Sequence, residues 1–503
     1  MKTRTSIFLF LFILTVLSLS VAGIFSPSGF AQKRVPVSAQ NHSLDERIRR
    51  VESGLLPSVI VKGESNALMK LADRIQFYKT PGVSVAVINN GKIEWARGYG
   101  VLEAGGNRLV TPETLFQAAS ISKPVAAFAA LRLVQENKLN LDEDVNKKLV
   151  SWKVPENDFT KEQKITLREL LSHSASLTVH GFAGYSSDKQ APTLLQILDG
   201  TSPANSKPIR VDGAPNKEFR YAGGGYVIMQ ELATGITGKP FPAFVQETIF
   251  KKLGMTRSTY QQPLPKEFWD SAAVGHRPNG EKVKGNWNTY PEMAAAGLWT
   301  TPSDLARFAI EIQKSKTGKS NKVLSVKMIN EMLAPQVGGW GLGPELQGKN
   351  ESKRFAHGGA NEGYRCVMVA YSDGGQGAVV MTNSDSGGAL AAEIMRSVAK
   401  EYGWLDYLPK EKVIASVDPK IYDGYVGQYQ LAPNFIITVT GENGKLTAQA
   451  TGQPKNELFA ESETDFFMKA VDAQIKFVKD AAGKVTGLVL RQGRRETPAQ
   501  KIK

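Results

Sequence analysis

The fold and the chemistry are decided by one stretch of the sequence, residues 116–139, which read FQAASISKPVAAFAALRLVQENKL. Ser120 and Lys123 stand near its start, and the residues that follow are rich in Ala and Leu, which favour a helix. Because residues three apart lie on one face of a helix, we expect the Ser120 hydroxyl and the Lys123 amine to meet. Burial among apolar side chains favours the neutral amine, which accepts a proton. The stretch therefore predicts a serine nucleophile beside its base.

The spacing of serine and lysine does not identify the nucleophile alone, because it recurs at Ser186 with Lys189 and at Ser397 with Lys400. The first of these serines lies in a polar loop near glycine, and the second falls late in a helical pattern. Ser120 instead starts a helix, where free backbone N–H groups and the helix dipole stabilise negative charge. The alternative is a serine that only caps the helix.

The composition is that of an ordinary soluble protein, with 42% hydrophobic and 22% charged residues. A chain of 503 residues is long enough for two or three domains. The formal charge of +14 is spread along the chain and forms no long Lys or Arg blocks. Nucleic-acid binding is therefore not expected, whereas attraction to anionic surfaces is compatible with the charge.

The first residues form a targeting segment. Lys2 and Arg4 precede an apolar run from Ile7 to about Phe25, and Gly29-Phe30-Ala31 supplies small residues for cleavage. Residues 1–31 are thus predicted to be a signal peptide, followed by a mobile linker over residues 32–43. An uncleaved membrane anchor is the alternative, since the apolar run is long enough. The only cysteine excludes an internal disulfide, and an exported protein without disulfides fits a bacterial envelope, either periplasmic or secreted.

Strand patterns occur near both ends of the first large region. Val83–Ile88 and Lys92–Arg97 flank an Asn-Asn-Gly turn, which predicts a hairpin. Tyr364–Tyr371 and Gly377–Thr382 are two further strand-like runs, and a helical pattern from Ala389 to about Tyr402 follows them. We expect an α+β domain over residues 44–405, with one antiparallel sheet built from its first and last parts and helices between.

The residue pattern changes after Pro409 from helical to strand-like. Short β-rich runs are separated by turn signals, of which Asn443-Gly444 is the strongest. Residues 415–503 are therefore predicted to form a separate small antiparallel β-barrel. This segment contains no His or Cys and no convincing catalytic group.

Three motifs in chain order resemble the penicillin-recognising serine hydrolases, in the class C β-lactamase-related branch that includes esterases, D-aminopeptidases and D-Ala-D-Ala carboxypeptidases. They are Ser120-Ile121-Ser122-Lys123, Tyr221-Ala222-Gly223 and His357-Gly358-Gly359. The resemblance implies a β-lactamase/transpeptidase-like domain, in which an antiparallel sheet is flanked by helices and joined to a helical subdomain. The C-terminal segment resembles a β-barrel appendage found on some family members.

The resemblance also implies roles. Ser120 is the acylated nucleophile, and Lys123 is the base that activates it directly or through Tyr221. Tyr221 also relays a proton to the leaving group. His357 and Gly359 lie on the sheet edge beside the nucleophile, and the N–H groups of Ser120 and Ala360 form the oxyanion hole. A buried core tyrosine is the alternative for Tyr221.

Two positions depart from the family pattern. Gly223 replaces the usual Asn and has no side chain to bind a substrate amide, and His357 replaces the usual Lys. Histidine is partly neutral near pH 7, so it holds a substrate carboxylate less well than lysine does. These changes disfavour efficient β-lactam hydrolysis. Lys316-Thr317-Gly318 spells the usual third motif, but it lies in a polar run after a helix with no strand pattern beside it.

The expected function is that of an exported serine hydrolase, which acts through an acyl-enzyme on ester or peptide-like amide bonds. The alternatives are a β-lactamase or D-Ala-D-Ala carboxypeptidase of cell-wall metabolism, and a non-catalytic binding protein that retains the fold. The spacing of the histidines predicts no metal site, and no cofactor is expected. The expected partners are a small-molecule or peptide-like substrate and the cell wall or envelope, and the sequence leaves the oligomeric state open.

Overall fold

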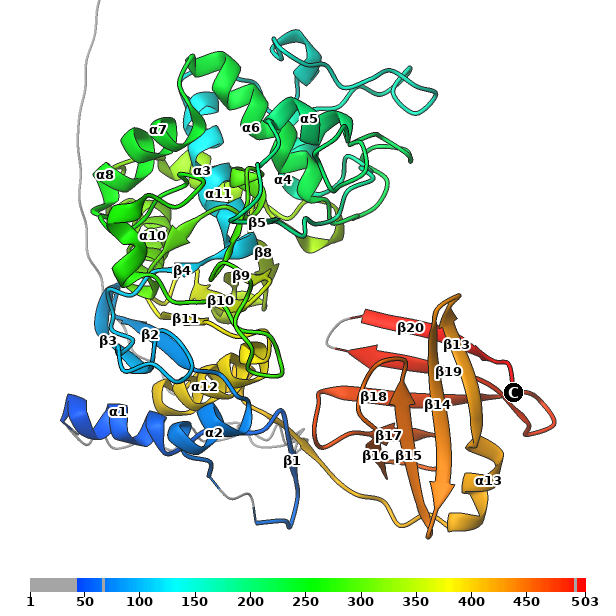
Figure 1. The fold of residues 1–503 in the computed structure, drawn as a ribbon. Coiled ribbons are helices and arrows are strands. Elements are labelled where there is room, and N and C mark those ends of the chain that lie inside the picture. The colour runs from blue at the N-terminus through cyan, green and yellow to red at the C-terminus, as the bar shows by residue number, and fades with distance from the viewer. Residues whose placement is uncertain (1–42, 66–67, 493–494) are drawn as a thin grey trace, which may run out of the picture. The chain divides into compact units, whose positions relative to one another are not determined.

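A computed structural model describes residues 43–65, 68–492 and 495–503. The sheet of the first large region is open and antiparallel, and its six strands lie in the order β3-β2-β11-β10-β9-β8 (Figure 1). The strands are β2 (Gly82–Asn89), β3 (Lys92–Gly100), β8 (Glu345–Gln347), β9 (Arg354–Asn361), β10 (Tyr364–Tyr371) and β11 (Gly377–Thr382). Val85 in β2 pairs with Val380 in β11, which joins the early hairpin to the late strands as the sequence predicts.

Helices cover both faces of this sheet. On one face lie α1 (Leu44–Glu52) and α12 (Gly387–Tyr402), with α2 (Leu71–Phe77) beside them. On the other lies α10 (Pro302–Lys316). Each face has its own buried apolar cluster, because successive strand residues point to opposite sides: Val85 and Val87 face α12, whereas Ala86 and Ile88 face the α10 side.

The region between the early and late strands is mainly helical, as predicted. Besides α10, its α-helices are α3 (Ser122–Gln135), α4 (Leu167–Ser172), α5 (Leu194–Asp199), α6 (Gly223–Thr237), α7 (Phe241–Val245), α8 (Lys251–Leu253), α9 (Met293–Ala296) and α11 (Val326–Met332). Thr166 caps α4 in a capping box with Glu169, and Thr301 caps α10.

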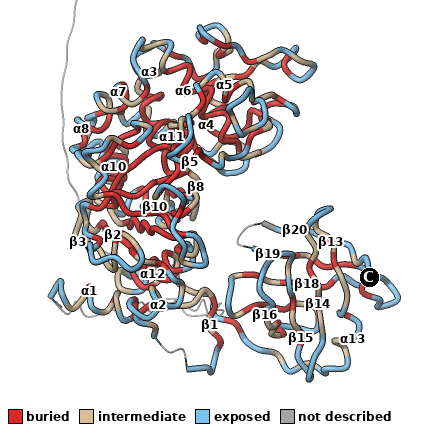
Figure 2. The backbone as a smooth tube through the Cα atoms, viewed as in Figure 1, coloured by how far each residue is buried: buried red, intermediate tan, exposed pale blue. Residues whose placement is uncertain are grey.

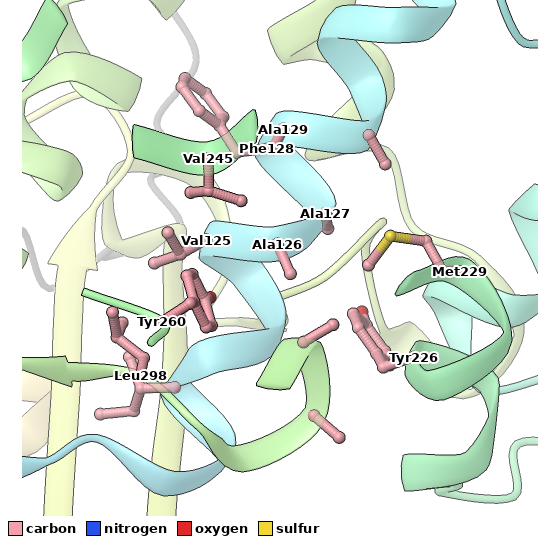
Figure 3. Packing of buried hydrophobic residues seen from close by; sticks show 14 of the residues in the cluster. Val125, Ala126, Ala127, Phe128, Ala129, Tyr226, Met229, Val245, Tyr260 and Leu298 are labelled. Carbon is pink, nitrogen blue, oxygen red and sulfur yellow. The ribbon is translucent and has the colours of Figure 1, made fainter. Parts of the chain in front are cut away.

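Helix α3 is buried on every side over its first ten residues (Figure 2). Its alanines allow close packing, and Figure 3 shows Ala126 and Ala127 toward Tyr226 and Met229 of α6. The Tyr260 hydroxyl donates to the Ser122 carbonyl at 2.6 Å near the start of the helix. The residues that carry the first motif are therefore fixed by packing and by hydrogen bonds.

Several short elements lie between the larger ones. Three strand pairs are β4 (Phe116–Gln117) with β7 (Trp299–Thr300), β5 (Tyr185–Ser186) with β6 (Asn288–Thr289), and β1 (Val59–Val61) in parallel with β12 (Lys410–Lys412). A π-helical segment, η3, spans Gln246–Phe250. The 3₁₀ segments are η1 (Ala119–Ile121), η2 (Val145–Lys147), η4 (Lys266–Ser271), η5 (Val337–Gly339), η6 (Asn350–Ser352), η7 (Leu405–Tyr407) and η8 (Pro419–Ile421).

The C-terminal residues form a closed antiparallel barrel, as predicted, preceded by α13 (Tyr422–Tyr425). The barrel strands are β13 (Gly427–Ala432), β14 (Phe435–Glu442), β15 (Lys445–Ala450), β16 (Asn456–Ala460), β17 (Asp465–Phe467), β18 (Ala473–Lys479), β19 (Val485–Gln492) and β20 (Arg495–Lys501). The buried cluster inside it is separate from the two clusters of the large sheet, so the barrel has a core of its own.

The predicted signal peptide and nearly all of the predicted linker lie outside the described residues. The proposed domain bounds stay predictions. Among the helices that the structure describes, none is both long and apolar enough to cross a membrane.

Candidate active site

Ser120 and Lys123 lie together at the start of α3. The Lys123 amine is hydrogen-bonded to Ser120 Oγ at 3.0 Å and donates to the Ala295 carbonyl at 2.8 Å. Lys123 is 2% exposed, whereas Ser120 is partly open to solvent. The second hydrogen bond holds the amine beside the hydroxyl, so this pair has the geometry of a nucleophile and a base.

Ser120 lies on the 3₁₀ turn η1, which leads directly into α3, so the α-helix begins at Ser122 and not at Ser120 as the sequence predicts. Ala119 before it has φ 50°, a left-handed conformation that is unfavourable for a residue with a side chain. This conformation is held by buried neighbours, since the Ala118 N–H donates to the Leu298 carbonyl at 2.8 Å. The backbone thus fixes the serine at a sharp bend between β4 and α3.

The segment 291–298, which contains α9, is anchored on several sides. Gln230 of α6 donates to the Pro291 carbonyl at 3.1 Å and accepts from the Ala294 N–H at 2.9 Å. At its other end, the Leu298 N–H donates to Ser122 Oγ at 3.0 Å. The acceptor for Lys123 therefore comes from a rigid segment, and not from a free loop.

Tyr221 lies close to the base, as the motif order implies. Its ring centroid is 5.0 Å from Lys123 Nζ and 4.2 Å from the ring of His173. His173 ends α4 in a left-handed conformation, and its Nδ1 accepts from the Ala222 N–H at 3.1 Å. Burial, with Lys123 and then His357 nearby, holds the pKa of His173 well below its ordinary value, so this ring is neutral. His173 thus positions the second motif.

The third motif lies on β9, beside the nucleophile. Strand β8 pairs with β9 only as far as Ala356, so the following residues have β10 on one side and η1 on the other. A Cβ atom at Gly359 would lie 2.2 Å from the Ala118 carbonyl oxygen, so only glycine allows β9 this close to the serine turn. Gly359 is buried, and Ala360 after it is exposed.

His357 is buried and carries no positive charge at neutral pH. Burial, followed by the nearby Lys123, lowers its pKa to about 3. Its ring lies 6.3 Å from Tyr221 and 5.7 Å from Trp340, centroid to centroid. The sequence suggests a histidine that is partly neutral near pH 7. In the structure it is neutral at every pH well above 3, because burial penalises the charged form.

An aromatic ring occupies the space that a side chain at Gly223 would take. A Cβ atom there would lie 3.0 Å from Cε2 of Phe182 and 3.2 Å from the His180 carbonyl oxygen. The Gly223 N–H donates to that same carbonyl at 3.0 Å, which holds the Phe182 loop against the second motif. The family's usual Asn does not fit beside Phe182 without movement.

Comparison with known proteins identifies the family of this chain. The family model described as Beta-lactamase matches residues 69–401, and a domain of unknown function (DUF3471) matches residues 411–501. The chain belongs to the beta-lactamase family of serine hydrolases. A curated relative, Penicillin-binding protein 4* of Bacillus subtilis (strain 168), is 26% identical over 438 residues, which cover 82% of this chain and 93% of the relative.

Two solved structures share the fold of this beta-lactamase family chain. The octameric penicillin-binding protein homologue from Pyrococcus abyssi is 21% identical, with a TM-score of 0.58 over 86% of this chain and 98% of that one. The D-amino acid amidase from Ochrobactrum anthropi SV3, complexed with L-phenylalanine amide, is 20% identical, with a TM-score of 0.56 over 72% of this chain and 99% of that one.

The structure adds an aromatic wall that the motifs do not reveal. Trp340 stacks on Phe219 at 5.0 Å and lies 6.0 Å from Tyr221, centroid to centroid. Trp340 follows η5 in a glycine-rich loop, and its indole N–H donates to the Gly343 carbonyl at 3.1 Å. An aromatic residue among glycines is the one sequence signal that could have singled it out.

The other sequence patterns lie away from this site. Ser397 of α12 donates to the Val51 carbonyl at 2.7 Å, and Ser186 lies in β5, so neither is packed beside Lys123. Lys316 ends α10 and pairs with Asp373, which agrees with the prediction that its motif is not the third one. Within the described ranges, no three or more His, Cys, Asp or Glu residues are grouped to hold a metal ion.

Proposed function

We propose that this chain is an exported serine hydrolase that forms an acyl-enzyme on Ser120 from an ester or a peptide-like amide. The observation that supports this proposal is the 3.0 Å contact between Lys123 Nζ and Ser120 Oγ, with Lys123 held by the Ala295 carbonyl. A serine hydroxyl becomes an effective nucleophile when an adjacent base takes its proton.

In the proposed reaction, Ser120 Oγ attacks the substrate carbonyl carbon and its proton passes to Lys123 Nζ. The N–H groups of Ser120 and Ala360 stabilise the oxyanion of the tetrahedral intermediate. Tyr221 relays the proton to the leaving alcohol or amine as the bond to the acyl carbon breaks. A water molecule then attacks the acyl-enzyme and releases the acid, which restores the Ser120 hydroxyl.

Uncharged substrates fit this site better than β-lactams do. The neutral His357 supplies no positive charge for a carboxylate, and Phe182 takes the place of an amide-binding side chain. A β-lactamase or D-Ala-D-Ala carboxypeptidase is the second candidate, which the likeness to penicillin-binding proteins favours. A non-catalytic binding protein is the third, and the Ser120, Lys123 and Tyr221 arrangement counts against it.

The export proposal rests on the basic and apolar residues at the start of the sequence. We propose a periplasmic or secreted enzyme associated with the envelope, which stays membrane-anchored if the signal is not cleaved. The mass of the N-terminal peptide from cells that express the full chain tests this directly. A mature form beginning after Ala31 supports export with cleavage, and an intact Met1 terminus in the cytoplasmic fraction contradicts export.

The function is tested by intact mass after incubation with a fluorophosphonate or with a penicillin. We expect one fluorophosphonate adduct, on Ser120, and slow or no penicilloyl adduct. Ser120→Ala should abolish labelling and the hydrolysis of a p-nitrophenyl ester. Ser186→Ala, at another serine with a lysine three residues later, is the matched control and should retain both. If Ser120→Ala were labelled as fully as the wild type, the nucleophile would lie elsewhere. Rapid penicillin turnover would favour the second candidate, a β-lactamase or D-Ala-D-Ala carboxypeptidase.

A further inference from the structure

The ring of His357 has one nitrogen without a hydrogen-bond partner among the described residues. Its Nδ1 lies 2.6 Å from the carbonyl oxygen of Gly358, which can only accept, so Nδ1 carries the proton. Because the ring is neutral, its Nε2 then holds a lone pair and is an acceptor. This Nε2 is buried and has no hydrogen-bond partner among the described residues.

The surroundings of His357 place this acceptor in the proposed site. Its ring faces Tyr221 and Trp340, and Lys123 is close enough to shift its titration. The amine of Lys123 is already hydrogen-bonded to Ser120 and Ala295. A buried acceptor without a donor is unfavourable, so a ligand that supplies the donor gains from filling it.

We propose that His357 Nε2 is a recognition site for a hydrogen-bond donor on the substrate, such as an amide or amine N–H or a hydroxyl group. The histidine thus reverses the role of the family's usual lysine, which supplies a cation for a carboxylate. A carboxylate in the same place would face a lone pair and repel it, whereas an N–H group would satisfy it. This inference rests on the proposed function, because the donor belongs to the substrate that acylates Ser120.

The test compares three p-nitrophenyl esters of one size, whose acyl chains end in a primary amide, a methyl ketone or a carboxylate: the adipamate, the 6-oxoheptanoate and the adipate half-ester. The amide offers a donor, the ketone only an acceptor, and the carboxylate a negative charge. In the wild-type enzyme, we expect kcat/KM for the amide to exceed that for the ketone by roughly tenfold, with the carboxylate slowest. Equal rates for amide and ketone, or a preference for the carboxylate, would overturn the proposal.

Two variants sharpen the comparison. His357→Gln keeps an acceptor oxygen and should retain the preference for the amide over the ketone, whereas His357→Lys should shift the preference toward the carboxylate. Gln453→Lys adds the same charge at an exposed barrel position and should shift nothing. If His357→Lys leaves the order of the three esters unchanged in a folded protein, the proposal is wrong; if it does not fold, the wild-type series decides.

Fluorophosphonate labelling separates this proposal from the one on which it rests, because the reagent does not need a donor in its acyl group. If Ser120 is labelled but the enzyme shows no preference among the three esters, only the proposed role of His357 is rejected, and Ser120 remains the proposed nucleophile. A failure to label Ser120 would reject the proposed nucleophile itself.

Discussion

The side-chain amide of Asn361 donates to Gln117 Oε1 at 2.8 Å, and so links the end of β9 to the strand that leads into the Ser120 turn. The same amide nitrogen donates to the Ala296 carbonyl at 3.1 Å, next to the residue that anchors Lys123. Both side chains are buried. One amide thus ties together the third motif, the serine segment and the segment that positions the base.

Replacing Asn361 with leucine should destabilise the protein and lower its rate of ester hydrolysis. The change leaves Gln117 Oε1 without one donor and the Ala296 carbonyl without another, which costs about 1–3 kcal/mol of unfolding free energy. Because the three segments lose their common link, kcat for ester hydrolysis should fall more than KM rises. Urea unfolding and steady-state kinetics measure both. Asn330→Leu, at an exposed position on α11, is the control, and an unchanged kcat in Asn361→Leu would deny the link a role in positioning.

Lys123→Arg should be nearly inactive, because a guanidinium group keeps its proton and cannot act as the base. Loss of a positioned base typically costs about 10²–10⁴-fold in rate. The buried site leaves little room for the larger side chain, so Lys123→Met, which has a similar length and no amine, serves as the second variant. Rates for a p-nitrophenyl ester, with melting temperatures to confirm folding, decide the matter. A fully active Arg variant would remove Lys123 from the chemistry.

Local patterns predicted the elements of this protein well. The early hairpin, the late strands and the barrel follow from alternation and turn residues, each of which acts over a few residues. Helix α2, by contrast, begins at Leu71 after Lys70, whose side chain makes no capping hydrogen bond, so no capping signal marks its start. A helix end depends on contacts with distant segments as well as on local propensity.

The candidate site was only partly predictable. The three motifs identify Ser120, Lys123, Tyr221 and His357, but not the carbonyl of Ala295 that holds the amine, because any residue supplies a backbone carbonyl. The contact between Phe182 and Gly223 joins residues far apart in sequence and has no pattern of its own. The loss of charge on His357 follows from burial in the tertiary structure, which the residue type does not reveal.

Glu292, at the start of α9, gives the stability of this protein a dependence on pH. It is fully buried, and neither carboxylate oxygen has a partner with good hydrogen-bond geometry in the described part of the chain, although the Tyr185 hydroxyl is near enough to lower its pKa in part. Burial raises the pKa of Glu292 from 4.5 to about 7. Between these values the folded state binds more protons than the unfolded state, so this residue makes stability fall as pH rises from 4.5 to 7.

Glu292→Gln should therefore be more stable than the wild type at pH 8 by up to about 3 kcal/mol, with little difference near pH 4. The pKa values of His173, His276 and His357 are lowered, which makes stability rise with pH below 6.5, but this contribution is common to both proteins. Urea unfolding at several pH values measures the difference. Glu267→Gln, at an exposed position, is the control, and an equal pH profile in wild type and Glu292→Gln would contradict the prediction.

The barrel should unfold independently of the catalytic machinery. Phe466 is fully buried in the barrel core, 5.6 Å from Tyr425 and 5.5 Å from Phe477 between ring centroids. Phe466→Ala should destabilise the barrel by about 3–5 kcal/mol and leave ester hydrolysis at 25 °C close to that of the wild type. Calorimetry and kinetics test this, with the exposed Val478→Ala as the control. Loss of activity in a folded Phe466→Ala protein would place part of the site in the barrel.

Gly223 and Phe182 should behave as a coupled pair. Gly223→Asn restores the family's usual second motif, but its Cβ atom would lie 3.0 Å from the Phe182 ring, so the ring or the Tyr221 loop must move. We expect the single variant to lose stability and kcat/KM, because Tyr221 is two residues away. Phe182→Ala removes the ring and makes room for the new side chain.

The double variant should therefore recover part of what Gly223→Asn loses, with a coupling energy of roughly 1 kcal/mol or more, as expected for residues in direct contact. A double-mutant cycle on kcat/KM for a neutral ester, and on the urea midpoint, measures it. Additive effects would mean that the ring does not confine residue 223. If the single variant instead gained activity, the Phe182 ring must be able to move aside freely. The missing amide-binding side chain at residue 223 would then limit the activity on substrates that carry such an amide.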